Sequence, residues 1–94
     1  MRSDHSRQRG DEGRPVQVAF NDAQRARQAD VFIQADDERY VVRGDRGREH
    51  IFEPNGELVT SLVRPQKAHQ RKVFREERLP ITEQQFEKFQ EIFI

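Results

Sequence analysis

Two histidines, His50 and His69, are the side chains of this sequence best suited to acid–base chemistry at neutral pH. An imidazole gains or loses a proton near pH 7, and a nearby lysine or arginine can stabilise the charge on a phosphate. We therefore keep a small, toxin-like, metal-free ribonuclease that uses His50 and His69 as an alternative function. No spacing brings the two rings together, and a strand histidine next to Phe52 is more typical of packing. Our first expectation is thus a protein without catalytic residues.

A basic segment is the most unusual feature of the chain. It carries five cations and no acid, namely Arg64, Lys67, Arg71, Lys72 and Arg75. Helical spacing of four residues aligns Lys67, Arg71 and Arg75 in one ridge, which suits phosphates or an acidic protein surface. The sequence therefore favours a non-enzymatic binding module whose basic helix, over residues 64–75, docks an anionic partner, either nucleic acid or an acidic protein. The alternative is an ordinary solvated face paired with acids of the last helix.

Metal and cofactor sites are not indicated. The chain has no cysteine, and the acids at 36–38 and the histidines do not fall at a known ligand spacing. No glycine motif that would hold a phosphate is present, and the Arg43-Gly44-Asp45 tripeptide is assigned to a turn. We expect neither a metal nor a cofactor.

Length and charge set broad limits. The 94 residues fit one domain, and the 17 basic and 17 acidic residues cancel, so any attraction to a partner must be local. No apolar run is long enough to span a membrane, and the first residues lack the apolar middle of a signal peptide. These features predict a cytoplasmic protein that does not enter a membrane.

The first 35 residues divide into a tail and less certain elements. Residues 1–14 hold one apolar side chain and predict a disordered tail, followed by a single domain over 15–94. Residues 15–20 alternate like a half-buried strand, and Asn21 or Asp22 is placed to cap a short alanine-containing helix. Residues 31–33 could continue that helix, although their β-branched and aromatic side chains favour a strand.

A three-stranded antiparallel meander is predicted between residues 39 and 64. Its three β-rich runs are separated by the breaks GDRG and EPNG, whose glycines, proline and asparagine are typical of tight turns. Side chains alternate along the middle strand, so His50 and Phe52 point to one face while Glu49 and Ile51 point to the other.

Two helices are predicted after the meander. Pro65 opens the basic helix, on which Val73 and Phe74 can face the sheet, and the segment EERLP ends it. The last helix begins with Thr82 as N-cap and Gln85 as its capping-box partner. Its apolar stripe consists of Phe86, Phe89 and Phe93, and its acidic stripe of Glu83, Glu87 and Glu91.

The resulting fold class is α+β: a small single domain with an antiparallel β-meander of three or more strands, packed on one face by the C-terminal helices. The phenylalanine stripe should contact Tyr40, Val42 and Phe52. A homodimer is also expected as one outcome, because Ile92 and Ile94 point partly away from that stripe. A frayed C-terminus with single exposed isoleucines is the other.

Overall fold

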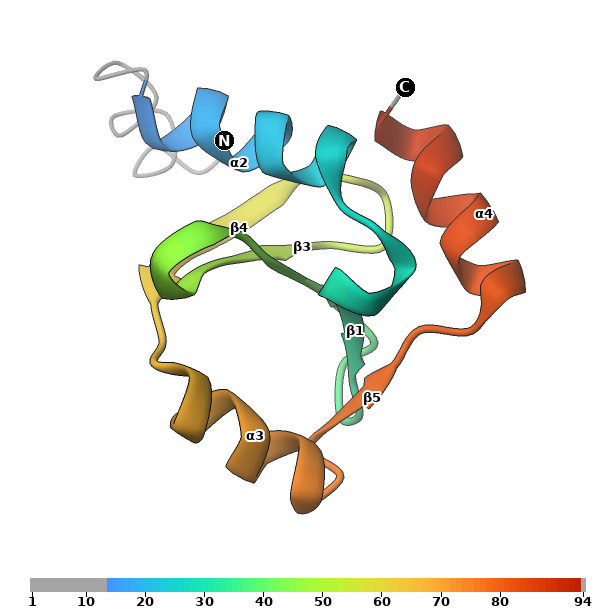
Figure 1. The fold of residues 1–94 in the computed structure, drawn as a ribbon. Helices are drawn as coiled ribbons and strands as arrows, with labels where there is room; N and C mark the ends of the chain where they lie inside the picture. Colours follow the sequence, from blue (N-terminus) through green and yellow to red (C-terminus); the bar gives the residue numbers. More distant parts are fainter. Residues whose placement is uncertain (1–13, 94) are drawn as a thin grey trace.

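The computed structural model describes residues 14–93 of the chain (Figure 1). Its helices are α2 (Arg14–Arg25), α3 (Gln66–Phe74) and α4 (Glu83–Phe93), and its strands are β1 (Val31–Gln34), β2 (Tyr40–Arg43), β3 (Arg48–Phe52), β4 (Leu58–Val63) and β5 (Arg78–Pro80). Two short 3-10 helices are η1 (Gln28–Asp30) and η2 (Asp45–Gly47). The predicted tail lies outside the described residues except for Arg14, at which α2 begins.

The strands form one antiparallel sheet in the order β4-β3-β2-β1-β5. The predicted meander is confirmed as β2, β3 and β4, with Tyr40 paired to Phe52 and His50 paired to Ser61. Gly47 and Gly56 have φ of 79° and 98° in the two turns, a region that glycine adopts without steric cost. The small α+β class predicted from the sequence is therefore confirmed.

Helix α2 replaces the strand that the alternation predicts over residues 15–20. The same residues also fit a helix, because Val16, Ala19, Phe20 and Ala23 recur at i, i+3, i+4 and i+7. Ala19 and Ala23 are buried against the sheet, and their small side chains let the helix backbone approach it closely. The apolar face therefore selects the helix.

Strand β1 decides a segment that the sequence leaves open, and strand β5 appears in a segment predicted only as a break. Residues 31–33 form a strand, as favoured, and the predicted break after α3 contains a short edge strand instead. In β5, Leu79 pairs with Ile33 and Pro80 pairs with Phe32 of β1. Three residues are too few for a periodic pattern, so only pairing with a distant strand defines β5.

Helices cover both faces of the sheet, so the prediction that the C-terminal helices share one face is wrong. Helices α2 and α4 pack on the face that carries Tyr40 and Phe52, whereas α3 lies on the opposite side (Figure 1). The chain passes from α3 to α4 through β5, at the edge of the sheet. This edge strand allows consecutive helices to occupy opposite faces.

The apolar core lies between α2, α4 and the sheet. Phe93 packs edge-on against Phe52 with ring centroids 4.7 Å apart, and Phe89 packs against Tyr40 at 5.1 Å. The predicted contacts of the stripe with Tyr40 and Phe52 are therefore confirmed, and Val42 belongs to the same buried cluster. The helix also begins as expected, because the Gln85 N–H donates to Thr82 Oγ1 and the Thr82 N–H donates to Gln85 Oε1. Within residues 14–93, no helix is long and apolar enough to cross a membrane.

Candidate functional site

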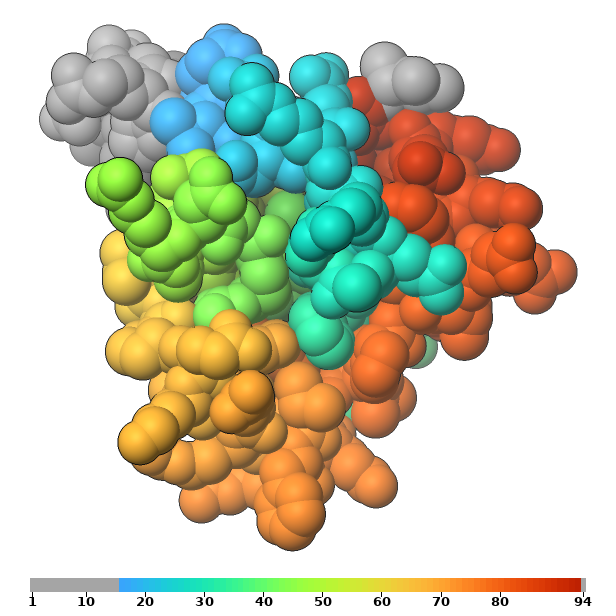
Figure 2. Space-filling model, viewed as in Figure 1, coloured from blue at the N-terminus to red at the C-terminus, as the bar shows by residue number. Residues whose placement is uncertain are grey.

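Helix α3 presents its basic side to solvent. His69 is buried, which fixes the inward side of the helix, and Lys67 and Arg71 lie on the outward side and are exposed. Phe74 was expected to face the sheet, but its side chain is 88% exposed, while Val73 is half-buried. The prediction for Phe74 is therefore wrong. Figure 2 shows α3 and the following turn, in orange, at the lower end of the molecule.

The five cations predicted to bind a partner differ in what they contact. Arg64 Nε donates to Glu49, Lys72 Nζ lies 3.2 Å from Glu77, and Arg75 lies 3.9 Å from the same carboxylate. Neither Lys67 nor Arg71 forms an ion pair with any residue between 14 and 93. Among the same described residues, no ion pair joins α3 to the acidic stripe of α4. The two unpaired cations are therefore the groups most available to a partner.

A charged cluster lies beneath α3, on the face of the sheet opposite the apolar core. Glu49 is fully buried and accepts two hydrogen bonds from Arg78, at 2.7 and 3.1 Å. Arg43 Nη1 and Arg64 Nε also donate to it, each at 3.1 Å. Three guanidinium groups thus surround one carboxylate, and they join β2, β3, β5 and the connection between β4 and α3.

The protonation states of this cluster follow from burial and from its arginines. Burial by itself raises the pKa of Glu49, but hydrogen bonds from Arg78 and Arg64 outweigh it and lower the pKa to about 2. Burial lowers the pKa of His69 to about 4, and the charges of Arg43 and Arg78 act in the same direction. His69 Nδ1 accepts a hydrogen bond from Arg78, which requires a neutral ring. Neither group is therefore poised for proton transfer near pH 7.

His50 lies on the other face of the sheet, under α2. Its Nε2 donates to Asp22 at 2.7 Å, and its Nδ1 lies 2.7 Å from Ser61 Oγ. Arg48 holds the same aspartate with two hydrogen bonds of 3.0 Å. Burial alone raises the pKa of Asp22, but the hydrogen bonds from Arg48 and His50 outweigh it and lower the pKa. Asp22 was predicted as a helix cap, and it instead ties the middle of α2 to the sheet.

The Asp22–His50–Ser61 chain has the residue types of a nucleophilic triad but not the access that catalysis needs. The His50 side chain is only 2% exposed, and both ring nitrogens already have partners within the protein. A substrate would have to displace α2 to reach the ring. These contacts therefore join α2, β3 and β4 rather than form an open active site.

The two histidines proposed for the ribonuclease alternative do not share a site. His50 contacts α2, whereas His69 contacts Arg78 and packs edge-on against Phe32, with ring centroids 4.6 Å apart. Glu49 and His50 are adjacent in β3 and point to opposite faces, so the sheet separates the two rings. Cleavage of RNA by this protein stays a prediction. It was motivated by the joint action of His50 and His69, and the two rings lie too far apart across the sheet to act together.

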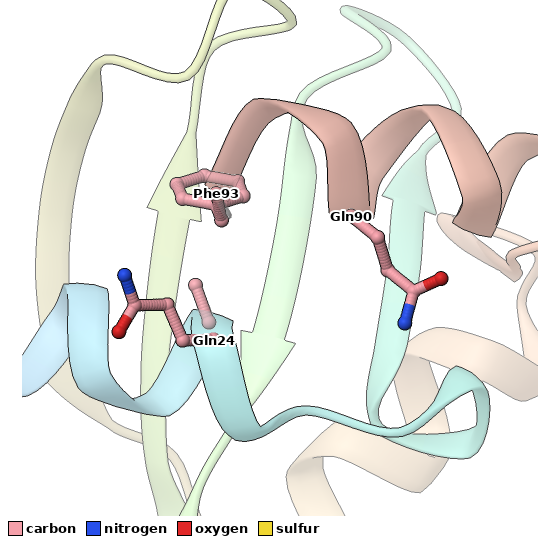
Figure 3. Close-up of a pocket in the computed structure, with 4 residues that line it drawn as sticks. Gln24, Gln90 and Phe93 are labelled. Carbon is pink, nitrogen blue, oxygen red and sulfur yellow. The ribbon is translucent and has the colours of Figure 1, made fainter.

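A shallow hollow lies between α2 and α4. It has a volume of about 300 Å³ and is lined by Ala23, Gln24, Gln90 and Phe93. Figure 3 shows Gln24 on α2 and shows Phe93 and Gln90 on α4, with the Gln90 amide pointing away from the Phe93 ring. The lining holds no ionisable group, so it offers no acid, base or nucleophile. Across residues 14–93, no three histidine, aspartate or glutamate side chains are grouped so that they could hold a metal ion.

No family model, curated protein or solved structure matches the chain. The structure is that of a small α+β domain with a five-stranded antiparallel sheet and helices on both faces. Its two distinctive polar features are the outward face of α3 and the cluster around Glu49. Sequence reasoning found the first. It missed Glu49 and Arg78, although the hairpin register does place Arg43 opposite Glu49.

Proposed function

We propose that this protein is a small non-enzymatic binding module whose basic helix α3 docks an anionic partner, and that the partner is nucleic acid. The observation that carries the proposal is the outward face of α3, where Lys67 and Arg71 are exposed and have no ion pair within residues 14–93. A cation without an internal partner keeps its full attraction for a phosphate. A paired cation must first give up its carboxylate.

The surroundings of α3 support an anionic partner. The chain contains no aspartate or glutamate from residue 58 to residue 75, although its net charge is zero. Residues four apart on a helix have Cβ atoms about 5–6 Å apart, so Lys67 and Arg71 can each meet a separate phosphate. The five predicted cations should contribute unequally: Lys67 and Arg71 most, Arg75 and Lys72 less because they lie near Glu77, and Arg64 least because it holds Glu49.

Salt dependence tests the proposal. Labelled RNA and DNA oligonucleotides, single-stranded and duplex, are titrated with the protein by fluorescence anisotropy at several salt concentrations. We expect affinity to fall steeply with salt. The Lys67→Gln/Arg71→Gln variant should have a shallower slope of log K against log salt, by about 0.7–0.9 for each phosphate that it no longer neutralises.

A matched control separates local contacts from total charge. The variant Arg25→Gln/Lys88→Gln removes two exposed cations from α2 and α4, so it changes the net charge by the same amount. It should bind nearly as well as the unmodified protein. Equal losses in both double variants would contradict docking through α3. Absence of binding to every nucleic acid at low salt would overturn the nucleic-acid proposal and leave an acidic protein surface as the partner of α3.

The enzymatic alternative has a direct test of its own. Purified protein is incubated with total RNA in the presence of a chelator, and the RNA is then analysed by gel electrophoresis. We expect intact RNA, because His50 and His69 are buried and lie on opposite faces. Cleavage that disappears in either His50→Ala or His69→Ala, with the fold intact by circular dichroism, would contradict the non-enzymatic proposal.

Self-association and location stay proposals. Ile92 is 37% exposed, and a side chain at Gly56 would collide with it, so the β3–β4 turn already covers part of the predicted dimer patch. Ile94 lies outside the described residues. Light scattering over a dilution series tests the homodimer, since a monomer mass at every concentration would contradict it. A cytoplasmic location is tested by fractionating cells that produce the protein.

A further inference from the structure

Phe74 is an aromatic ring on the outside of the molecule. Its side chain is the most exposed of the large apolar residues described, whereas Phe52 and Phe89 are completely buried. Burying a phenylalanine side chain stabilises a folded protein, and the fold forgoes this stabilisation at position 74. Packing within the domain does not explain the position of this ring.

The surroundings of Phe74 are charged rather than apolar, and the acids Glu76 and Glu77 follow in the next turn, where Glu77 lies beside Lys72 and Arg75. Arg71 lies three residues before Phe74 and Lys67 seven residues before it, so the helical repeat places all three on the outward side, away from buried His69. The other exposed residues of this side are Gln70 and Arg75, and both are polar. A protein or lipid partner that binds through apolar contact would find a single ring there. A flat ring flanked by cations instead matches the combination of stacking and phosphate contacts found at single-stranded nucleic-acid sites.

We infer that the outward face of α3 binds single-stranded nucleic acid, with one base stacked on Phe74 and adjacent phosphates on Arg71 and Lys67. This inference rests on the proposed function and narrows it. In a duplex each base is already stacked between its neighbours and its faces are covered, whereas an unpaired strand can present a base to the ring. Phe74 follows Lys67 by seven positions, a rise of about 10 Å along the helix, so the face contacts only a short stretch of the strand.

Substitutions at Phe74 separate stacking from simple apolar contact. Short labelled oligouridylate and a duplex of the same length are titrated by anisotropy with the unmodified protein, Phe74→Ala, Phe74→Leu and Phe74→Tyr. Ile92→Ala, which shortens an exposed apolar side chain on α4, is the control. We expect tighter binding of the single strand, a loss of roughly 5- to 150-fold for the alanine and leucine variants, and near-normal binding for the tyrosine variant and the control.

Phe74→Trp gives a second and independent readout. The chain contains no tryptophan, so this variant carries a single indole on α3. A base stacked on the indole should quench its fluorescence, and the quenching should saturate at the same oligonucleotide concentration as the anisotropy change. Saturated anisotropy without any change in fluorescence would place the strand away from position 74 and overturn the inference.

The outcomes distinguish this inference from the proposed function. Normal binding by Phe74→Ala, together with weakened binding by Lys67→Gln/Arg71→Gln, overturns stacking and leaves phosphate docking in place. Normal binding by Phe74→Leu, or equal affinity for duplex and single strand, also overturns the inference. If no nucleic acid binds at low salt, the proposed function fails and the inference fails with it. Phe74 is exposed, so circular dichroism should show all its variants folded.

Discussion

The two faces of the sheet are held to their helices by different chemistry. On one face, Phe89 and Phe93 of α4 pack against Tyr40 and Phe52. The small alanines of α2 are buried in the same apolar cluster. On the other, Arg43 and Arg78 of the charged cluster around Glu49 donate hydrogen bonds to Gln66 and His69 of α3, and His69 also packs against Phe32. An apolar layer tolerates many substitutions of similar volume, whereas a buried carboxylate needs specific partners at specific positions. The face under α3 should therefore be the more sensitive to single changes.

Removal of the central carboxylate should have the largest effect. Glu49→Leu leaves Arg78 and two further guanidinium groups close together without their counter-ion. Losing one partner of a buried ion pair typically costs about 3–5 kcal/mol. Urea unfolding followed by circular dichroism measures the change in the free energy of unfolding.

The double variant Glu49→Leu/Arg78→Met is the control for this effect. It removes the most buried cation together with the carboxylate, so it should be more stable than Glu49→Leu alone. A single variant that costs less than about 1 kcal/mol would show that the cluster does not hold this face, since surface changes rarely exceed about 0.5 kcal/mol.

Truncation of the apolar face should follow closely. Phe89 is completely buried and contacts Tyr40 and Phe93, so Phe89→Ala should cost about 3 kcal/mol or more in the free energy of unfolding. Phe74→Ala is the same substitution at an exposed ring, and we expect a change within about 0.5 kcal/mol. Equal thermal midpoints for both variants would contradict the packing described for α4.

The effect of pH on the charged face should be smaller and confined to one range. The pKa of a histidine side chain is ordinarily 6.5 and that of His69 in the folded protein is about 4, so between these values the unfolded chain binds more protons. Stability should therefore fall as the pH is lowered from 6.5 towards 4, by about 2–3 kcal/mol from this residue. The pKa of Glu49 is lowered from 4.5 to about 2, so its stabilisation is lost as the pH falls from about 4.5 towards 2, mostly below the range of His69.

His69→Gln isolates that contribution. The glutamine amide can still accept a hydrogen bond from Arg78, but it does not titrate. The free energy of unfolding of both proteins is measured by urea unfolding from pH 7 to pH 4. As the pH falls, the unmodified protein should lose more stability than the variant. A constant difference across this range would mean that His69 is not held neutral by its surroundings.

Local patterns in the sequence were sufficient for the meander and the last helix. The turns at Gly47 and Gly56 and the Thr82–Gln85 capping box depend on residues that are neighbours in the chain, so their signals survive without tertiary contacts. The stripe that contains Phe89 identified the buried face of the last helix, because helical spacing is also a local pattern. The basic segment is also visible in the sequence, since five cations fall between residues 64 and 75.

Tertiary structure alone decided how these elements combine. The strand pattern of residues 15–20 was outweighed by the space that Ala19 and Ala23 leave against the sheet, and β5 exists because it pairs with β1, a strand far earlier in the chain. Arg78 meets Glu49 for the same reason, and Phe74 is exposed because His69 takes the inward side of α3. Such contacts depend on chain reversals between distant residues, and no local propensity or periodicity records them.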